Sequence, residues 1–222
     1  NFRAMTPARP WFLPDRLIYN FSFNSFNNAF ADALAKGILK FALWKESIPE
    51  AKGTQDYIGV NYYTRDQIKF DLWAEKNVFQ KRYFDPKAEL SENGYIATEP
   101  AGFAEAIQWA QRYHLPIYIT ENGVEDSHDR MRPHYLITHL YELWRAIQRG
   151  ADVRGYMHWS QIDNFEWERG WTQRFGLWGL DVTTQERIRR PSVDIYANIC
   201  SQNSITSQNI LQYAPELRDE IK

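Results

Sequence analysis

Three short apolar segments, separated by amphipathic stretches, constrain the fold of this chain more than any other feature. They cover residues 57–64, 115–123 and 153–160, are rich in β-branched and aromatic residues, and end in polar side chains. Uninterrupted apolar runs of this length are typical of strands buried on both faces of a parallel sheet. We therefore predict an α/β fold of consecutive βα units, in a parallel sheet or a barrel.

The stretches around these segments carry apolar residues at helical spacing. We predict helices over residues 20–39, 100–113, 133–150 and 191–199, the first ending near Gly37. Each of the first two predicted strands is thus followed by a helix before the next strand begins. This order is that of a parallel α/β protein.

The remaining segments lack a clear period. We expect a loop over residues 1–15, an irregular charged excursion over 65–97, a long loop over 161–181 and a peripheral polar tail over 200–222. Long excursions after strands commonly decorate the catalytic rim of α/β enzymes. A closed eight-stranded barrel needs about 250 residues, so three strands in 222 residues indicate part of a barrel domain.

Charge and apolar patterning argue against several classes of protein. The 26 Lys and Arg residues nearly balance the 28 Asp and Glu residues and form no basic stripe, so we expect no nucleic-acid partner. The apolar runs are far too short to span a bilayer, so we expect no membrane association. The single cysteine, Cys200, excludes an internal disulfide framework and is compatible with a cytoplasmic location.

Aromatic residues are unusually abundant, with 9 Trp, 13 Tyr and 13 Phe. Such residues fill cores, but an excess beside polar groups also suits sugar rings, whose C–H faces stack on indoles. Glu121 ends one of the predicted strands, where substrates and catalytic groups gather in α/β folds. Because Asn122-Gly123 follows it, a simple polar turn is an equally good interpretation of Glu121 alone.

Motifs at the ends of the predicted strands are more specific. They are Ile-Gly-Val-Asn-Tyr-Tyr-Thr at 58–64, Ile-Thr-Glu-Asn-Gly at 119–123, Trp-Ser-Gln-Ile-Asp-Asn-Phe-Glu-Trp at 159–167 and Arg-Phe-Gly-Leu at 174–177. In this order they resemble the C-terminal half of the family 1 glycoside hydrolases, the β-glucosidase and β-galactosidase group. The resemblance covers residues 1–199. It implies a (β/α)8 TIM barrel, of which this chain supplies strands 6 to 8 and helices 5 to 8, as the C-terminal part of a single domain.

The resemblance implies a retaining reaction in which Glu121 is the nucleophile. Retaining glycosidases use two carboxyl groups roughly 5 to 5.5 Å apart, one attacking the anomeric carbon and one protonating the leaving oxygen. Tyr63 is similar to the family tyrosine that donates a hydrogen bond to the nucleophile. A buried core phenol is the ordinary alternative for Tyr63.

The resemblance also implies a substrate-binding set, in which Asn61 is included. Glu166 is similar to the residue that accepts hydrogen bonds from the 4- and 6-hydroxyls, and Trp167 to a donor to the 3-hydroxyl. Trp159 resembles the platform beneath the ring, and Phe175 resembles the residue near the exocyclic carbon. Simple packing of the tryptophans, or an ion pair of Glu166 with Arg169 or Arg174, are the structural alternatives.

The acid/base glutamate of the family lies in a Thr-x-Asn-Glu-Pro motif that this sequence does not contain. Glu99-Pro100 aligns instead with the start of the sixth helix, and we reject it as the acid. We therefore expect the acid on the N-terminal half of the same enzyme, either on a second chain or in the intact parent. His134 and His139 are five residues apart, unlike a helical zinc pair, and we expect neither a metal nor a cofactor.

The resemblance thus implies a β-glycosidase that hydrolyses terminal β-linked glucose or galactose from oligosaccharides or glycosides. A non-catalytic sugar-binding module on the same fold is the alternative from another class. A 6-phospho-β-glycosidase is disfavoured because the carboxylate of Glu166 would repel a phosphate.

Overall fold

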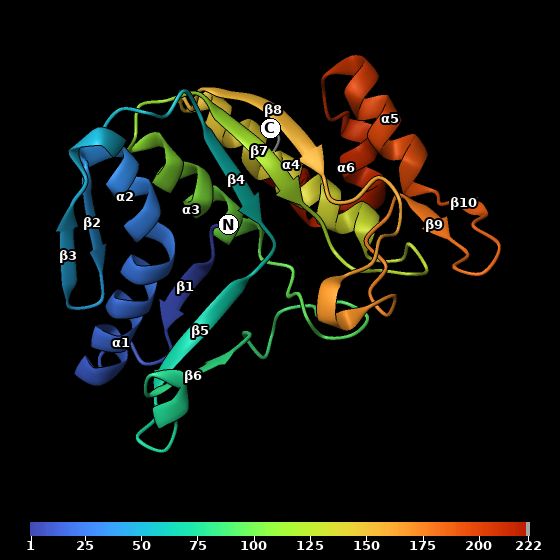
Figure 1. Cartoon of the computed structure of the whole chain (residues 1–222). Coiled ribbons are helices and arrows are strands. Elements are labelled where there is room, and N and C mark those ends of the chain that lie inside the picture. The colour runs from blue at the N-terminus through green and yellow to red at the C-terminus, as the bar shows by residue number, and fades with distance from the viewer. Residues whose placement is uncertain (221–222) are drawn as a thin grey trace.

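A parallel sheet lies at the centre of the computed structural model, which describes residues 1–220 (Figure 1). Its strands are β4 (Ile58–Tyr62), β7 (Ile117–Asn122) and β8 (Val153–His158), hydrogen-bonded in the order β4-β7-β8. Both pairings are parallel. All three predicted strands are therefore confirmed.

Helices follow each of these strands, as the sequence predicted. They are α3 (Pro100–Gln111), α4 (Arg132–Gln148) and α5 (Ser192–Gln202). In Figure 1, α3 and α4 lie behind the sheet, while α5 lies beside β8. Proline in the first turn of α3 and α4 is compatible with the helix because its missing N–H would lack a partner there anyway.

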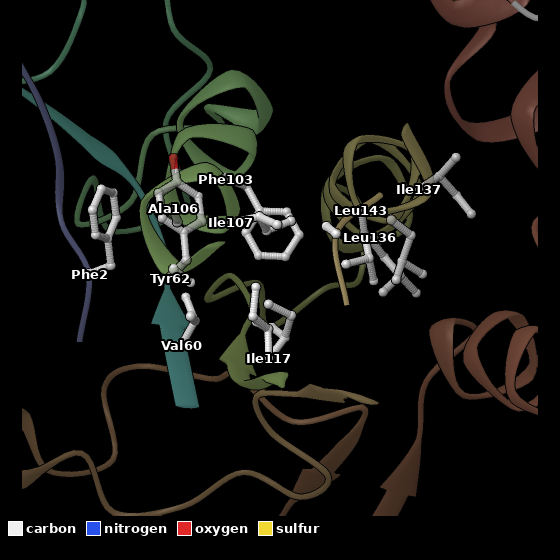
Figure 2. Packing of buried hydrophobic residues seen from close by; sticks show 14 of the residues in the cluster. Phe2, Val60, Tyr62, Phe103, Ala106, Ile107, Ile117, Leu136, Ile137 and Leu143 are labelled. Atoms are coloured by element: carbon white, nitrogen blue, oxygen red, sulfur yellow. The ribbon is translucent and has the colours of Figure 1, made fainter. Parts of the chain in front are cut away.

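The main core lies between the sheet and these two helices (Figure 2). Val60 and Ile117 of the strands pack with Phe103 and Leu136 of the helices, and all are buried. Tyr62 stacks on Phe103, with a centroid separation of 5.4 Å. Burial of each such side chain contributes about 1.5–3 kcal/mol, so this interface holds the ends of β4 and β7 in place.

The opposite face of the sheet is open, and the expectation of strands buried on both faces is wrong for this part of the protein. Tyr57 is 55% exposed and Met157 is 44% exposed. Within residues 1–220, β4 and β8 each pair with one neighbouring strand only, so both are edge strands of this sheet. The outer edge of β4 accepts one backbone hydrogen bond, from Phe2 N–H to Asn61 O at 2.9 Å. A parallel sheet with one bare face and two edge strands is incompletely covered.

The N-terminal segment is ordered, which corrects the expected loop over residues 1–15. It contains β1 (Ala4–Pro7), and α1 (Leu13–Phe23) begins within it. β1 pairs in parallel with β5 (Arg65–Phe70), and Asp15 accepts a hydrogen bond from the Phe70 backbone N–H. These contacts join residues that are distant in sequence, so no local sequence pattern predicts them.

The helix predicted over residues 20–39 is present but begins earlier and is interrupted. A π-helical turn (Asn24–Asn28) joins α1 to α2 (Ala29–Lys36), which ends at Gly37 with a φ of 70°. The expected apolar face is only partly buried, because Phe26 and Phe30 are exposed. Small residues of α2 face the interior instead.

Short hairpins lie in or beside the segments expected to be loops, and one of them takes residues 38 and 39 from the end of the predicted helix. The excursion over residues 65–97 contains β5 and β6 (Gln80–Tyr83), which form a sheet in the order β1-β5-β6. The other hairpin strands are β2 (Ile38–Phe41), β3 (Trp44–Ser47), β9 (Trp178–Leu180) and β10 (Arg187–Arg189). In Figure 1, β5 and β6 extend away from the central sheet.

The segment expected to be a peripheral tail contributes two buried residues to the core, although most of it is exposed. Residues 207–213 form α6 (Ser207–Tyr213), whose first turn is closed by a capping box of Thr206 and Asn209. Ile210 and Ala214 are buried in the main cluster. Residues 221 and 222 of that tail lie outside the described residues. No helix of residues 1–220 is long and apolar enough to cross a membrane.

Candidate active site

A pocket of about 640 Å³ opens where β4, β7 and β8 end. Every residue that the sequence analysis assigned to a site lines this pocket. These residues are Asn61, Tyr63, Glu121, Trp159, Glu166, Trp167 and Phe175. The structure therefore brings together seven residues that are spread over more than 110 positions of the chain.

Glu121 and Tyr63 form the pair at the end of the first two strands. The Tyr63 hydroxyl donates a hydrogen bond to Glu121 Oε2 at 2.6 Å. Burial, followed by this hydrogen bond, raises the pKa of Tyr63 well above its usual value. The phenol therefore keeps its proton and remains a donor to the carboxylate. This direct contact favours the functional interpretation of Tyr63 over that of an ordinary core phenol.

A bulge in β7 turns Glu121 toward the pocket. Val60 pairs with Ile119, but the next residue of β4, Asn61, pairs with Glu121, so Thr120 is extra. Ile119 faces the core, and strict alternation would have placed Glu121 on that same face. The extra residue reverses the alternation, as bulges near active sites commonly do.

Asn122, after the bulge, ties the end of β7 to its neighbours. Its Nδ2 donates to Tyr62 O at 2.9 Å and to the Tyr135 hydroxyl at 3.0 Å, and its Oδ1 accepts from Tyr156. Asn122 is fully buried, and the amide oxygen and both amide hydrogens have partners. The sequence analysis treated this residue as part of a turn and missed its role as an anchor.

Gly123 is required by a close approach. A Cβ atom at this position would lie 1.8 Å from the carbonyl oxygen of Trp159. Any side chain would push β7 away from the residue that follows β8. The Asn-Gly pair therefore serves packing between strand ends, beyond its role in a turn.

Asn61 lies beside the bulge. Its Oδ1 accepts a hydrogen bond from the Thr120 hydroxyl at 2.5 Å. Within residues 1–220, the Asn61 amide nitrogen donates no hydrogen bond to another side chain. Its N–H groups are therefore available at the pocket wall.

The second wall of the pocket is the loop after β8. Glu166 Oε1 accepts hydrogen bonds from Asn164 Nδ2 at 2.7 Å and from Trp159 Nε1 at 3.2 Å. Arg174 instead lies 3.6 Å from Asp163, and Arg169 lies 3.9 Å from Glu168. The alternative of an ion pair between Glu166 and either arginine is therefore not what the structure shows.

The aromatic residues of this wall differ in their surroundings. Trp167 and Phe175 both line the pocket, but Trp167 is 83% exposed, whereas Phe175 is buried. Phe175 packs edge-to-face on Tyr63, with centroids 6.0 Å apart. Trp159 both lines the pocket and holds Glu166, which goes beyond the platform role expected of it.

A buried ion pair holds the loop that follows β8. Arg190 donates to both carboxylate oxygens of Asp163, at 2.9 and 3.0 Å. The backbone N–H groups of Gly176 and Leu180 donate to the same carboxylate. Asp163 thereby fixes both ends of the segment that carries Glu166, Trp167 and Phe175. No local sequence pattern paired Asp163 with Arg190.

Two further residues at the pocket rim escaped the sequence analysis. Tyr95 and Arg169 both line the pocket, and the guanidinium carbon lies 3.7 Å from the Tyr95 ring centroid. Tyr95 lies four residues after Ser91, and the Ser91 hydroxyl donates a hydrogen bond to the fully buried Glu125. Burial raises the pKa of Glu125. The excursion over residues 65–97 therefore reaches the edge of this pocket at Tyr95.

The remaining candidates lie outside the pocket. Glu99 is the residue before α3, as the sequence indicated, and lies 3.9 Å from Arg65. His134 Nε2 lies 2.6 Å from Glu216, whereas His139 is buried against Tyr135. Within residues 1–220, no group of three or more His, Cys, Asp or Glu side chains is arranged to hold a metal ion.

The sequence matches the model of glycosyl hydrolase family 1 over residues 23–205. The chain belongs to glycosyl hydrolase family 1. The β-galactosidase of Saccharolobus solfataricus is 37% identical over 186 residues, which cover 81% of this chain and 38% of that protein. β-Glucosidase A of Thermotoga maritima is 34% identical over 73% of this chain and 38% of its own length.

Solved family 1 structures show the same architecture. The β-glycosidase of Pyrococcus horikoshii superimposes with a TM-score of 0.87 at 34% identity, over 96% of this chain and 49% of that one. The T. maritima β-glucosidase superimposes with a TM-score of 0.80 at 27% identity. It has been solved with deoxynojirimycin and with galacto-hydroximolactam. These relatives are TIM-barrel glycosidases, and this chain spans about half of their length.

Proposed function

We propose that this chain carries the nucleophile and the sugar-binding pocket of a retaining β-glycosidase. The observation that carries the proposal is the hydrogen bond from Tyr63 to Glu121 at 2.6 Å, inside a pocket that also holds Glu166 and two indoles. A carboxylate held by a protonated phenol beside a sugar-sized cavity suits attack on an anomeric carbon.

In the first step Glu121 attacks the anomeric carbon while the glycosidic C–O bond breaks. The leaving oxygen takes a proton from a carboxylic acid, and a glycosyl ester forms on Glu121. In the second step the carboxylate that gave up its proton to the leaving oxygen takes a proton from water. The water oxygen attacks the anomeric carbon and releases Glu121 as a carboxylate. Two inversions give net retention. Tyr63 donates its hydrogen bond to the carboxylate before the first step and after the second.

The sugar pocket favours an unphosphorylated, terminal glucose or galactose. Glu166 would accept hydrogen bonds from sugar hydroxyls, and Trp167 would donate one from its indole. Trp159 would lie against the apolar face of the ring, with Phe175 near the exocyclic carbon and Asn61 at the pocket wall. A carboxylate repels a phosphate group, so 6-phosphosugars are disfavoured. The ligands bound by the T. maritima relative support a gluco- or galacto-configured substrate.

The proton donor would come from a second part of the barrel. We assign this chain to strands 6 to 8 and helices 5 to 8, the C-terminal half, because its motifs occur in that order and the acid motif does not occur in it. No further strand of residues 1–220 pairs with the outer edges of β4 and β8, and one sheet face is open, which supports this assignment because a closed barrel would pair both edges and cover that face. The N-terminal half of the same enzyme is the proposed partner.

Turnover of nitrophenyl β-glucoside by the assembly that contains this chain tests the proposal. Native mass identifies the active species, either this chain with a second polypeptide or a longer parent. Glu121→Gln should lower turnover by more than about a thousandfold, since it removes the nucleophile. Glu168→Gln, on an exposed side chain, is the matched control.

A 2-deoxy-2-fluoro-glucoside should add one sugar to the intact mass, on Glu121 in the wild type and on no residue in Glu121→Gln. Unchanged rates in the glutamine variant would reject Glu121 as the nucleophile. Sugar binding without turnover in a complete assembly would instead favour the non-catalytic module.

A further inference from the structure

The side chain of Asn164 connects the hydroxyl of Ser160, in the loop after β8, to the carboxylate of Glu166. Its Nδ2 lies 2.7 Å from Glu166 Oε1, and its Oδ1 lies 3.2 Å from the Ser160 hydroxyl. A carboxylate accepts hydrogen bonds only, so the atom of Asn164 that faces it must be the amide nitrogen. The chemistry of Glu166 therefore determines the orientation of the amide.

Glu166 receives both of its recorded hydrogen bonds on one oxygen. Trp159 Nε1 and Asn164 Nδ2 approach Oε1, and within residues 1–220 the structure records no hydrogen bond to Oε2. A glutamate side chain has three rotatable bonds and would otherwise sample several rotamers. Two donors on Oε1 restrict these rotamers and leave the lone pairs of Oε2 available.

Asn164 is itself held firmly. The preceding residue, Asp163, is buried and accepts hydrogen bonds from Arg190 and from two backbone N–H groups. Asn164 is partly buried, and its Oδ1 lies 3.2 Å from the Ser160 hydroxyl, whose single hydrogen is shared with Ile162 O at 2.9 Å. A donor on such a support is suited to position a neighbour with little loss of freedom when a ligand binds.

We propose that Asn164 is a positioning residue that holds Glu166 by Oε1 and so presents Oε2 to the hydroxyls of the bound sugar. Asn164 itself does not touch the sugar. This inference rests on the proposed function, because it assigns Glu166 to hydroxyl recognition. It predicts that the contribution of Asn164 depends on the hydroxyl groups that Glu166 contacts.

Hydrolysis of three nitrophenyl β-glycosides, the glucoside and its 4-deoxy and 6-deoxy analogues, tests the inference in the active assembly. Asn164→Ala should raise KM and lower kcat/KM for the glucoside by about tenfold to a hundredfold, as for loss of a hydrogen bond to a charged group. Asn164→Asp should lower kcat/KM further, because it replaces the hydrogen-bond donor with a carboxylate of the same charge as Glu166. Gln161→Ala, on an exposed side chain of the same loop, is the control.

The deoxy analogues separate positioning from a purely structural role. If Asn164 acts through Glu166, Asn164→Ala should lower kcat/KM several-fold less for an analogue that lacks a hydroxyl recognised by Glu166 than for the glucoside. An equal loss with all three substrates, or no loss with the glucoside, would overturn the inference.

A crystal structure of Asn164→Ala provides a readout that does not depend on turnover. The Glu166 carboxylate should leave its wild-type position or become disordered, while Asp163 and Arg190 remain paired. An unmoved carboxylate would overturn the inference even in an active enzyme. A wild-type assembly that hydrolyses no β-glycoside would reject the proposed function, and the crystallographic comparison would still decide whether Asn164 positions Glu166.

Discussion

The two walls of the pocket are built in different ways. Glu121 lies on a strand whose next residue, Asn122, is fully buried and hydrogen-bonded to β4, α4 and β8. Glu166 lies on a loop that is held by side chains, through Asn164 and the Asp163–Arg190 pair. The group proposed for bond making thus rests on the sheet and the apolar core, whereas the group proposed for sugar recognition rests on a polar network. The two walls should therefore respond to different substitutions.

The largest effect should come from breaking the support of the loop wall. Asp163→Asn leaves the buried Arg190 cation without its carboxylate, and loss of one partner of a buried pair costs about 3–5 kcal/mol. Urea unfolding should show this loss in the free energy of unfolding. Hydrogen exchange should show greater opening of residues 160–180 than of β7.

Asp152→Asn is the matched control, because Asp152 pairs with Arg154 on an exposed surface and its loss should leave the urea midpoint nearly unchanged. Equal loosening of β7 and of the loop after β8 would show that the two walls are one unit.

A smaller effect is expected from the strand wall. Tyr63→Phe removes the hydrogen bond to Glu121 but keeps the ring that packs on Phe175. We expect kcat/KM for nitrophenyl β-glucoside to fall about tenfold to a hundredfold, with little change in stability. Tyr213→Phe in α6 provides the same chemical change away from the pocket. Unchanged kinetics in Tyr63→Phe would assign Tyr63 to packing alone.

The same division explains which features the sequence could predict. The strands at 58–62, 117–122 and 153–158 and their helices are local patterns of apolar residues, and all were predicted. The seven pocket residues were found through the resemblance of their motifs to family 1 glycoside hydrolases. Four of them, Asn61, Tyr63, Glu121 and Trp159, also lie where strands of the parallel sheet end, which brings them together.

Long-range contacts determine the features that were missed. β1 pairs with β5, whose residues lie 61 positions further along the chain, and Ile210 and Ala214 join the core from a segment of polar composition. The orientation of Glu121 depends on a bulge that simple alternation does not predict. The Asp163–Arg190 pair joins residues 27 apart that carry no shared local pattern.

The smallest effect concerns the helix layer behind the strand wall, where His139 is buried in α4. Its ring stacks on Tyr135 with a centroid separation of 3.7 Å, its Nδ1 lies 2.7 Å from Tyr135 O, and its Nε2 has no partner. Burial lowers the pKa of His139 to about 3. In the unfolded chain a histidine takes up its proton near pH 6.5, at the usual pKa of about 6.5. The unfolded state therefore binds more protons than the folded state below that pH, and stability falls on acidification until the pH reaches about 3.

His139→Phe should keep the aromatic packing and remove this proton uptake. The free energy of unfolding, measured in urea between pH 7.5 and 4.5, should then decrease less steeply by up to about 1.4 kcal/mol per pH unit. A residual slope should remain, because burial also lowers the pKa of His158 to about 3. His114→Asn, on an exposed turn with a φ of 54° that asparagine tolerates, is the control and should retain the wild-type slope. A wild-type slope in His139→Phe would mean that His139 is not held neutral behind the strand wall, and that this wall is more accessible to solvent than its packing indicates.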